Sequence, residues 1–134
     1  MICAGFGGAL AISAAAVGDH LLASDPQAAM LVRTGAAYAI YHCLAILGLI
    51  AIAAHRPLAG RRLADRLLRL AGWLFIAGTA LFSGGLWMLA AGLGVGGLAP
   101  VGGSLLILGW LTLAASGAAC VRQDRKPPPG KEIP

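Results

Sequence analysis

The sequence consists of four long apolar runs that are separated only by short polar segments. The runs cover about residues 2–22, 29–54, 70–92 and 100–121. About 20 apolar residues suffice for a helix to cross the hydrocarbon core of a bilayer, so each run is long enough to span a membrane. Only 11% of the residues are charged, whereas a soluble domain has about 25%, so a water-soluble fold is excluded. The sequence predicts one all-α domain of four transmembrane helices, residues 1–121, followed by a proline-rich tail, residues 122–134, that we expect to be disordered.

Basic residues are concentrated in two segments, which predict how the helices are oriented. One segment joins the second and third runs and reads HRPLAGRRLADRLLR over residues 55–69, and the other is the tail. Together they hold nine of the ten Lys and Arg residues, and only Arg33 lies elsewhere. Because basic residues flank transmembrane helices on the cytoplasmic side, the central segment and both chain termini are expected to lie in the cytoplasm.

The central segment has a helical pattern of its own. Arginines fall on one side of a helix and leucines on another, the leucines being Leu63, Leu67, Leu70 and Leu74. The pattern predicts a short amphipathic helix that lies in the lipid headgroup layer between the second and third spans. Its arginines either fix only the orientation of the chain or also bind anionic lipids, and the candidate lipid contacts are Arg61, Arg62, Arg66 and Arg69. Asp65 is spaced to pair with Arg61 or Arg69 one turn away.

Two stripes of polar residues are expected near the middle of the membrane. They are Thr34, Tyr38 and His42 in the second run and Thr79, Ser83 and Trp87 in the third. Residues four apart share one face of a helix, so we expect the stripes to face each other, with His42 hydrogen-bonded to Ser83 or Tyr38. One interpretation is a binding or proton-relay site, and the other is hydrogen bonding that only holds the helices together. The second is favoured, because no Asp or Glu lies near the midplane.

Motifs of the common enzyme classes are absent from the sequence. It has no nucleophile elbow, phosphate-binding loop or HExxH pattern, so we expect no catalytic residue, no metal and no other cofactor. His20 lies near the outer end of the first run, roughly 12 Å from the level of His42, which is too far for a shared metal or haem site. Asp19 and Arg33 are both near the outer surface and could pair across the first hairpin.

Several short motifs resemble those of a known family. Gly18 and His20 lie in a segment similar to the family's GAFGAH motif, and Thr34-Gly35, Tyr38 and His42 match its pattern in the second helix. The segment 82–87, which contains Ser83 and Gly84, is similar to FSGSLY, and Pro100, Gly102 and Gly103 followed by Gly109-Trp110 resemble TPxGG…GW. The family is the domain of unknown function 423 family, also called YgdD-like, of small bacterial inner-membrane proteins, with transmembrane protein 256 as an animal relative. The resemblance implies a four-helix membrane protein without an established activity, and it strengthens His20, Tyr38, His42 and Ser83 as candidates.

Two functions are compatible with this pattern. The first is a non-enzymatic accessory or scaffold subunit of the inner membrane that contacts lipids. The alternative is a small oligomeric transporter or channel with a polar path lined by His42, Tyr38 and Ser83. In both cases we expect the chain to form a homo-oligomer or to dock on a larger membrane complex, because four short spans enclose little interior of their own. Nucleic acid is not an expected partner, because the basic residues flank apolar runs.

Overall fold

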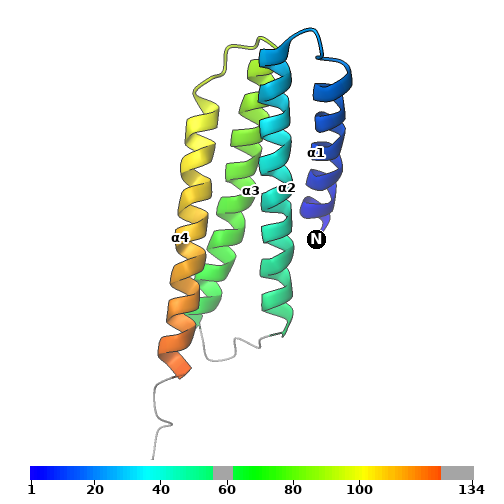
Figure 1. Ribbon diagram of the computed structural model, residues 1–134. Coiled ribbons are helices and arrows are strands. Elements are labelled where there is room, and N and C mark those ends of the chain that lie inside the picture. The colour runs from blue at the N-terminus through cyan, green and yellow to red at the C-terminus, as the bar shows by residue number, and fades with distance from the viewer. Residues whose placement is uncertain (56–61, 125–134) are drawn as a thin grey trace, which may run out of the picture.

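The structure is a computed structural model that describes residues 1–55 and 62–124, and its regular secondary structure over these residues is all helical. Its elements are α1 (Ile2–His20), α2 (Pro26–His55), α3 (Arg62–Ala90) and α4 (Leu98–Asp124). All four helices are long and apolar enough to cross a membrane, as the sequence predicted. They run antiparallel to their neighbours, with the α1–α2 and α3–α4 turns at the same end of the molecule (Figure 1).

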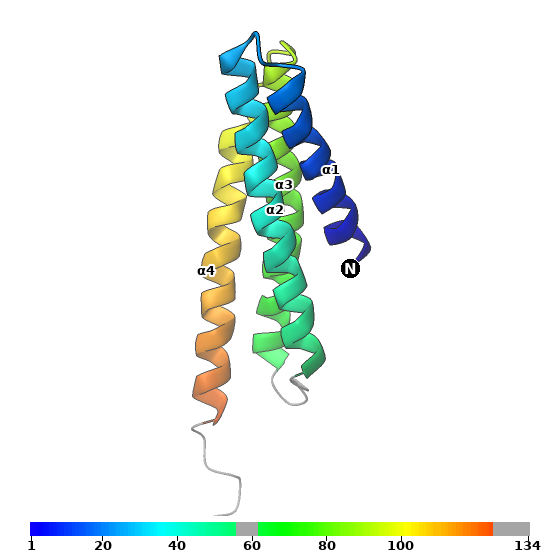
Figure 2. The same cartoon turned by 45° about the vertical axis from the view of Figure 1, so that its right-hand side comes forward.

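The helices form an open layer rather than a closed ring. Extensive packing occurs between α1 and α2, between α2 and α3, and between α3 and α4. Two views of the ribbon agree that α1 and α4 lie on opposite sides of the central pair (Figures 1 and 2). With 19 residues, α1 is shorter than α2, which has 30, and it begins partway along α2. The lower half of the α2–α3 pair is therefore covered by α4 on one side and only partly by α1 on the other.

Local sequence signals explain both turns at this common end. Pro26 is the first residue of α2, and the carboxylate of Asp25 accepts a hydrogen bond from the backbone N–H of Ala28 over 3.0 Å. A capping Asp followed by Pro at the first helical position is a common start of a helix. The turn between α3 and α4 contains Gly92 and Gly94 at φ values of +76° and +66°, a backbone conformation that favours glycine.

The basic segment does not form a helix of its own. Residues from Arg62 onward are the first turns of α3, which continues without interruption to Ala90. The prediction of a separate interfacial helix was therefore wrong for the described residues 62–69, while residues 56–61, Arg61 among them, lie outside the described part of the chain. No proline interrupts α3, and its buried stripe runs on through Ala64, Leu68 and Ala71, so the helix has no reason to end at the membrane surface.

The buried stripe of α3 is also rotated from the predicted leucine face. Leu63 and Leu70 are about half exposed, whereas the neighbouring Ala64 and Ala71 are buried. One residue corresponds to about 100° around a helix, so the buried stripe is rotated by about this angle from the leucines. In a membrane the large apolar residues can face lipid, because lipid tails are as apolar as leucine, while small residues allow helices to approach closely.

Small residues at seven-residue intervals form the contact between α3 and α4. They are Ala64, Ala71 and Gly78 on α3 and Gly102, Gly109 and Ser116 on α4, and all six are buried. The antiparallel pairing is direct at both ends, because Ser116 Oγ donates to the backbone oxygen of Ala64 over 2.8 Å, and a Cβ on Gly102 would lie 2.8 Å from the backbone oxygen of Gly78. Phe75 is fully buried against this contact and packs over Gly109.

Candidate functional site

His42 is a buried polar residue of α2, with only 5% of its surface exposed. Its Nδ1 lies 2.8 Å from the backbone oxygen of Tyr38, one turn earlier in the same helix. The Nε1–H of Trp110 in α4 donates to His42 Nε2 over 3.3 Å. The two bonds fit the imidazole tautomer that carries its proton on Nδ1 and donates it to the Tyr38 carbonyl. Both ring nitrogens are therefore used within the protein.

Six rings, that of His42 included, form an aromatic cluster, which consists of Tyr38, Tyr41, His42, Phe75, Phe82 and Trp110. Ring centroids are 5.0 Å apart for Phe75 and Trp110 and 5.4 Å apart for His42 and Phe75. Tyr38 lies 4.8 Å from Phe82. These separations are in the range of favourable aromatic pairs. The cluster joins α2, α3 and α4, and its outer rim is exposed at Tyr38 (43%), Tyr41 (60%) and Trp110 (50%).

Ser83 and Trp87 join α3 to α2, but not through the polar stripe of α2. Ser83 Oγ donates to the backbone oxygen of Gly35 over 2.7 Å, and Trp87 Nε1 donates to that of Val32 over 3.2 Å. The expectation that the two stripes would face each other was therefore wrong. The physical reason is Gly35, where a Cβ would lie 2.6 Å from Trp87 Nε1. Because a glycine exposes the backbone, the donors of α3 reach main-chain oxygens instead of side chains.

The predicted polar cluster is thus only partly assembled. His42 bonds to Tyr38, one of its two predicted partners, but it uses the backbone oxygen of Tyr38 and does not bond to Ser83. Thr34 is half-buried near the α1–α2 turn, where it borders a pocket with Arg33. The Oγ1 of Thr79 is buried and has no hydrogen-bond partner among the described residues.

The predicted residues at the outer end of α1 have different environments. Asp19 Oδ1 lies 2.5 Å from Arg33 Nε, which confirms the expected pair across the first hairpin. Both side chains are about half exposed, so the pair contributes up to about 1 kcal/mol. Gly18 is buried against α2, where a Cβ would lie 3.3 Å from Val32 Cγ1. His20 is the exposed last residue of α1.

The remaining motif residues, three at the start of α4 and Gly84 in α3, also differ among themselves. A Cβ on Gly102 would overlap the backbone nitrogen of Phe82, whereas one on Gly103 would lie 3.6 Å from Phe82 Cδ2, an ordinary contact. Pro100 is exposed in the first turn of α4. A Cβ on Gly84 would have no atom within 4 Å. Of these four residues, only Gly102 is required by close backbone packing.

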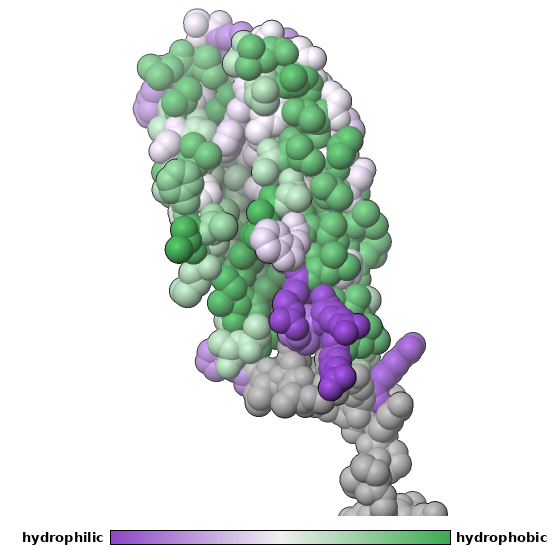
Figure 3. All heavy atoms as spheres, turned by 180° about the vertical axis from the view of Figure 1, so that it is seen from behind, coloured by the Kyte–Doolittle hydropathy of each residue, from purple (hydrophilic) through white to green (hydrophobic). Residues whose placement is uncertain are grey.

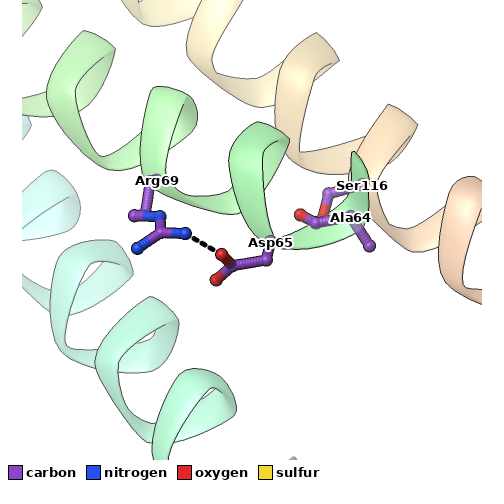
Figure 4. A network of polar contacts seen from close by, with 4 residues as sticks. All are labelled: Ala64, Asp65, Arg69 and Ser116. Atoms are coloured by element: carbon purple, nitrogen blue, oxygen red, sulfur yellow. Dashed lines mark hydrogen bonds and ion pairs between the residues drawn. The ribbon is translucent and has the colours of Figure 1, made fainter. Parts of the chain in front are cut away.

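The first turns of α3 carry the predicted lipid contacts. Arg62, Arg66 and Arg69 are exposed. Arg69 forms an ion pair with Asp65, which confirms one of the two pairings expected from their spacing (Figure 4). Next to this pair, Ser116 and Ala64 connect α4 to α3 (Figure 4).

Three buried side chains of the α3–α4 contact were missed in the sequence: Phe75, Leu106 and Ser116. Their types are common in apolar runs, so composition did not mark them. The available signal was the seven-residue spacing of small residues in α3 and α4, which is typical of closely packed helices.

The chemistry open to this site is limited by its packing. The polar groups of His42, Ser83 and Trp87 are bonded to backbone oxygens, and His42 also accepts a hydrogen bond from Trp110. They are therefore not directed into an open cavity. Over the described ranges 1–55 and 62–124, no three His, Cys, Asp or Glu side chains are grouped so that they could hold a metal ion. The arrangement is suited to fixing the register of α2, α3 and α4.

Comparisons with known proteins agree with the motifs and the helices. The family model described as "Protein of unknown function (DUF423)" matches residues 14–103. The chain is 34% identical over 98 residues to a "UPF0382 membrane protein" of Haemophilus influenzae, covering 72% of this chain and 71% of the relative. It is 34% identical over 116 residues to the "UPF0382 membrane protein YwdK" of Bacillus subtilis, covering 80% and 85%. No solved structure matches. The protein is a multi-pass membrane protein and belongs to the DUF423 family of proteins of unknown function.

Proposed function

We propose that the protein is a non-enzymatic scaffold protein of the bacterial inner membrane that associates with a second copy of itself. The association would use the α2–α4 face, which we define by the exposed rings Tyr38, Tyr41 and Trp110. The observation that carries this proposal is the environment of the Tyr41 hydroxyl. Neither it nor the Tyr38 hydroxyl has a hydrogen-bond partner within the described residues.

The depth of Tyr41 makes an unpartnered hydroxyl unfavourable. Tyr41 follows Arg33 by eight residues, which places it about 12 Å further into the membrane than that charged residue. His55, near the opposite surface, is still farther away along α2. From this depth the side chain cannot reach water or headgroups, and an unbonded polar group in hydrocarbon costs several kcal/mol. A protein surface that supplies a donor or an acceptor would remove this cost.

A second copy of the chain is the partner that the chemistry of this face fits best. A hydroxyl both donates and accepts hydrogen bonds, so the same face on two copies is complementary to itself across a two-fold axis. Twofold dimers are the most common oligomers and use the same patch on both subunits. The three exposed rings that define the face carry no charge that would repel an identical copy.

The charge pattern supports an orientation with both termini in the cytoplasm. Four of the five described Lys and Arg residues lie toward the end of the molecule where α3 begins and α4 ends, namely Arg62, Arg66, Arg69 and Arg122, and only Arg33 lies toward the other end. With an even number of spans, both termini would be on the side of these four residues. Basic flanking residues favour the cytoplasmic side of a bacterial inner membrane.

Transport along a path through His42 has weaker support. Its ring is almost completely buried between Phe75 and Trp110, and both ring nitrogens are bonded. A conducting site would need room for a solute beside the imidazole, which this packing does not leave.

Photo-cross-linking in intact membranes tests the proposed face. Ile107 is 64% exposed and lies one turn before Trp110, so a benzoylphenylalanine at position 107 should cross-link to a second copy. The same label at Phe6 of α1, which is 75% exposed, is the matched control and should give little dimer. Tyr41→Phe should lower the yield from position 107 by about threefold or more, because an interhelical hydrogen bond in a membrane contributes about 0.6 kcal/mol on average.

Three results of this experiment would contradict self-association. One is an equal dimer yield from positions 107 and 6, and another is an unchanged yield in Tyr41→Phe. The third is a cross-linked product whose mass corresponds to a different protein, which would replace the second copy by a larger complex as the partner of this face.

A further inference from the structure

A groove lies between α2 and α3 on the side of the molecule that carries α1. It has a volume of about 260 Å³, at the lower end of the range for ligand sites. Its walls include Leu49, Ile50 and Ala53 of α2 and Gly72 and Ile76 of α3, and Met1, the residue before α1, also lines it. The groove exists because α1 begins partway along α2 and because Gly72 has no side chain to fill the space.

One end of this groove is basic. Asp65 and Arg69 are part of its lining. Arg66 and Arg62 precede Arg69 by about one and two turns of α3, so they lie along the same edge of the helix. Figure 3 shows hydrophilic residues gathered at this end of the molecule, directly beside an apolar surface. Three arginines against one aspartate leave an excess of positive charge where the groove ends.

The length of α3 places this charged end at the level of the lipid headgroups. With 29 residues α3 is about 43 Å long, whereas the hydrocarbon core is about 30 Å thick. The turns from Arg62 to Arg69 therefore project into the headgroup layer. Trp73 lines the groove just above Arg69 and is 69% exposed, and tryptophan is enriched at this interface.

We infer that the groove holds one acyl chain of an anionic phospholipid whose phosphate binds Arg69. The inference does not depend on self-association, because the groove and the α2–α4 face involve different surfaces of α2. Arg69 Nη2 donates to the carboxylate of Asp65, and the guanidinium has further N–H donors that remain available to a phosphate. The Arg69 side chain is 71% exposed, so these donors are accessible to a headgroup.

An anionic phospholipid fits the groove better than a helix of another protein. The walls are apolar and the charge is confined to one end, which is the distribution of a phospholipid with its chain and its phosphate. Basic residues next to a membrane attract anionic lipids with about 1 kcal/mol each.

Native mass spectrometry of the full-length protein, after detergent exchange with added dioleoyl-phosphatidylglycerol or dioleoyl-phosphatidylcholine, tests the site. The wild-type chain should retain one phosphatidylglycerol and retain phosphatidylcholine less well. Arg69→Gln should lower the phosphatidylglycerol-bound fraction about fivefold, which corresponds to about 1 kcal/mol. Arg122→Gln, at the exposed end of α4, is the matched charge control and should change it little.

A second pair of variants tests whether the acyl chain binds in the groove. A Cβ on Gly72 would lie 3.7 Å from Leu49 Cδ1, an ordinary contact, and Gly72 lines the groove, so the side chain of Gly72→Leu is expected to occupy the groove. This change should abolish retention of both lipids. Gly48→Leu, on an exposed part of α2 where a Cβ would have no atom within 4 Å, should leave retention unchanged and controls for a general effect of Gly→Leu.

Several outcomes would overturn the inference. Equal retention of the two lipids would exclude recognition of the negative headgroup, and equal effects of Arg69→Gln and Arg122→Gln would indicate diffuse surface charge. Retention that survives Gly72→Leu would place the lipid elsewhere. A bound mass that corresponds to a peptide or to another copy of the chain would assign the groove to a protein.

Discussion

Gly102→Ala is expected to destabilise the protein by about 3 kcal/mol or more, enough to separate α4 from α3. The added Cβ would overlap the backbone nitrogen of Phe82 and lie 2.8 Å from the carbonyl oxygen of Gly78. Both are main-chain atoms of α3, so neither can move without displacing the helix. Overpacking of a close contact typically costs about 1–3 kcal/mol, and a clash with backbone lies at or above the upper end of this range.

The neighbouring glycine provides the control for this prediction. Gly103→Ala adds the same methyl group one residue later, where it would lie 3.6 Å from the ring of Phe82. The stability should change by no more than about 1 kcal/mol, because the higher helix propensity of alanine offsets the cost of the added contact. Thermal unfolding in detergent, followed by circular dichroism and tryptophan fluorescence, measures both variants. Equal stabilities of the two variants would contradict the close approach of α3 and α4 at Gly102.

His42→Ala is expected to lower the stability by about 2–4 kcal/mol. The substitution empties the space between Phe75 and Trp110 and removes the acceptor of the Trp110 indole N–H. Truncation of a large buried side chain to alanine has this magnitude because the cavity closes only partly. Unfolding in increasing fractions of dodecyl sulfate, monitored by tryptophan fluorescence, provides the measurement.

A double-mutant cycle separates the hydrogen bond from the packing. Trp110→Phe keeps an aromatic ring in place but removes the N–H donor, and it should cost about 1 kcal/mol. If the bond between Trp110 and His42 contributes, His42→Ala should cost less in the Trp110→Phe background, by about 0.6–1.7 kcal/mol. A coupling energy of zero would mean that the hydrogen bond between the two side chains does not contribute to stability.

The sequence predicted the four membrane-spanning helices, because hydrophobic length and charge act within a single segment. Asp25 before Pro26 and the glycines after α3 marked the ends of helices in the same way. The Asp19–Arg33 and Asp65–Arg69 pairs were also predicted, since both depend on local spacing or on a single hairpin. The sequence did not predict that α3 begins at Arg62, ahead of the predicted start of the third span at about residue 70.

Predictions that depended on the contact between two helices were less accurate. The leucine pattern predicted the apolar side of the first turns of α3. The interface with α4 lies about 100° away around the helix, at Ala64 and Ala71. In a membrane, hydrophobicity does not distinguish the lipid-facing side from the protein-facing side, so size is the better signal. Ser83 and Trp87 were expected to meet side chains, but the absence of a side chain at Gly35 gave them backbone oxygens instead.

The most direct test of the proposed self-association is to count the copies of the chain in each complex within a lipid environment. The protein, labelled at its C-terminus with one fluorophore per chain, would be released from its own membrane in polymer-bounded native discs and examined by single-molecule photobleaching. We predict two bleaching steps in most discs and mainly one step for the Tyr41→Phe variant at the same density. One-step bleaching of the wild-type protein would contradict the account.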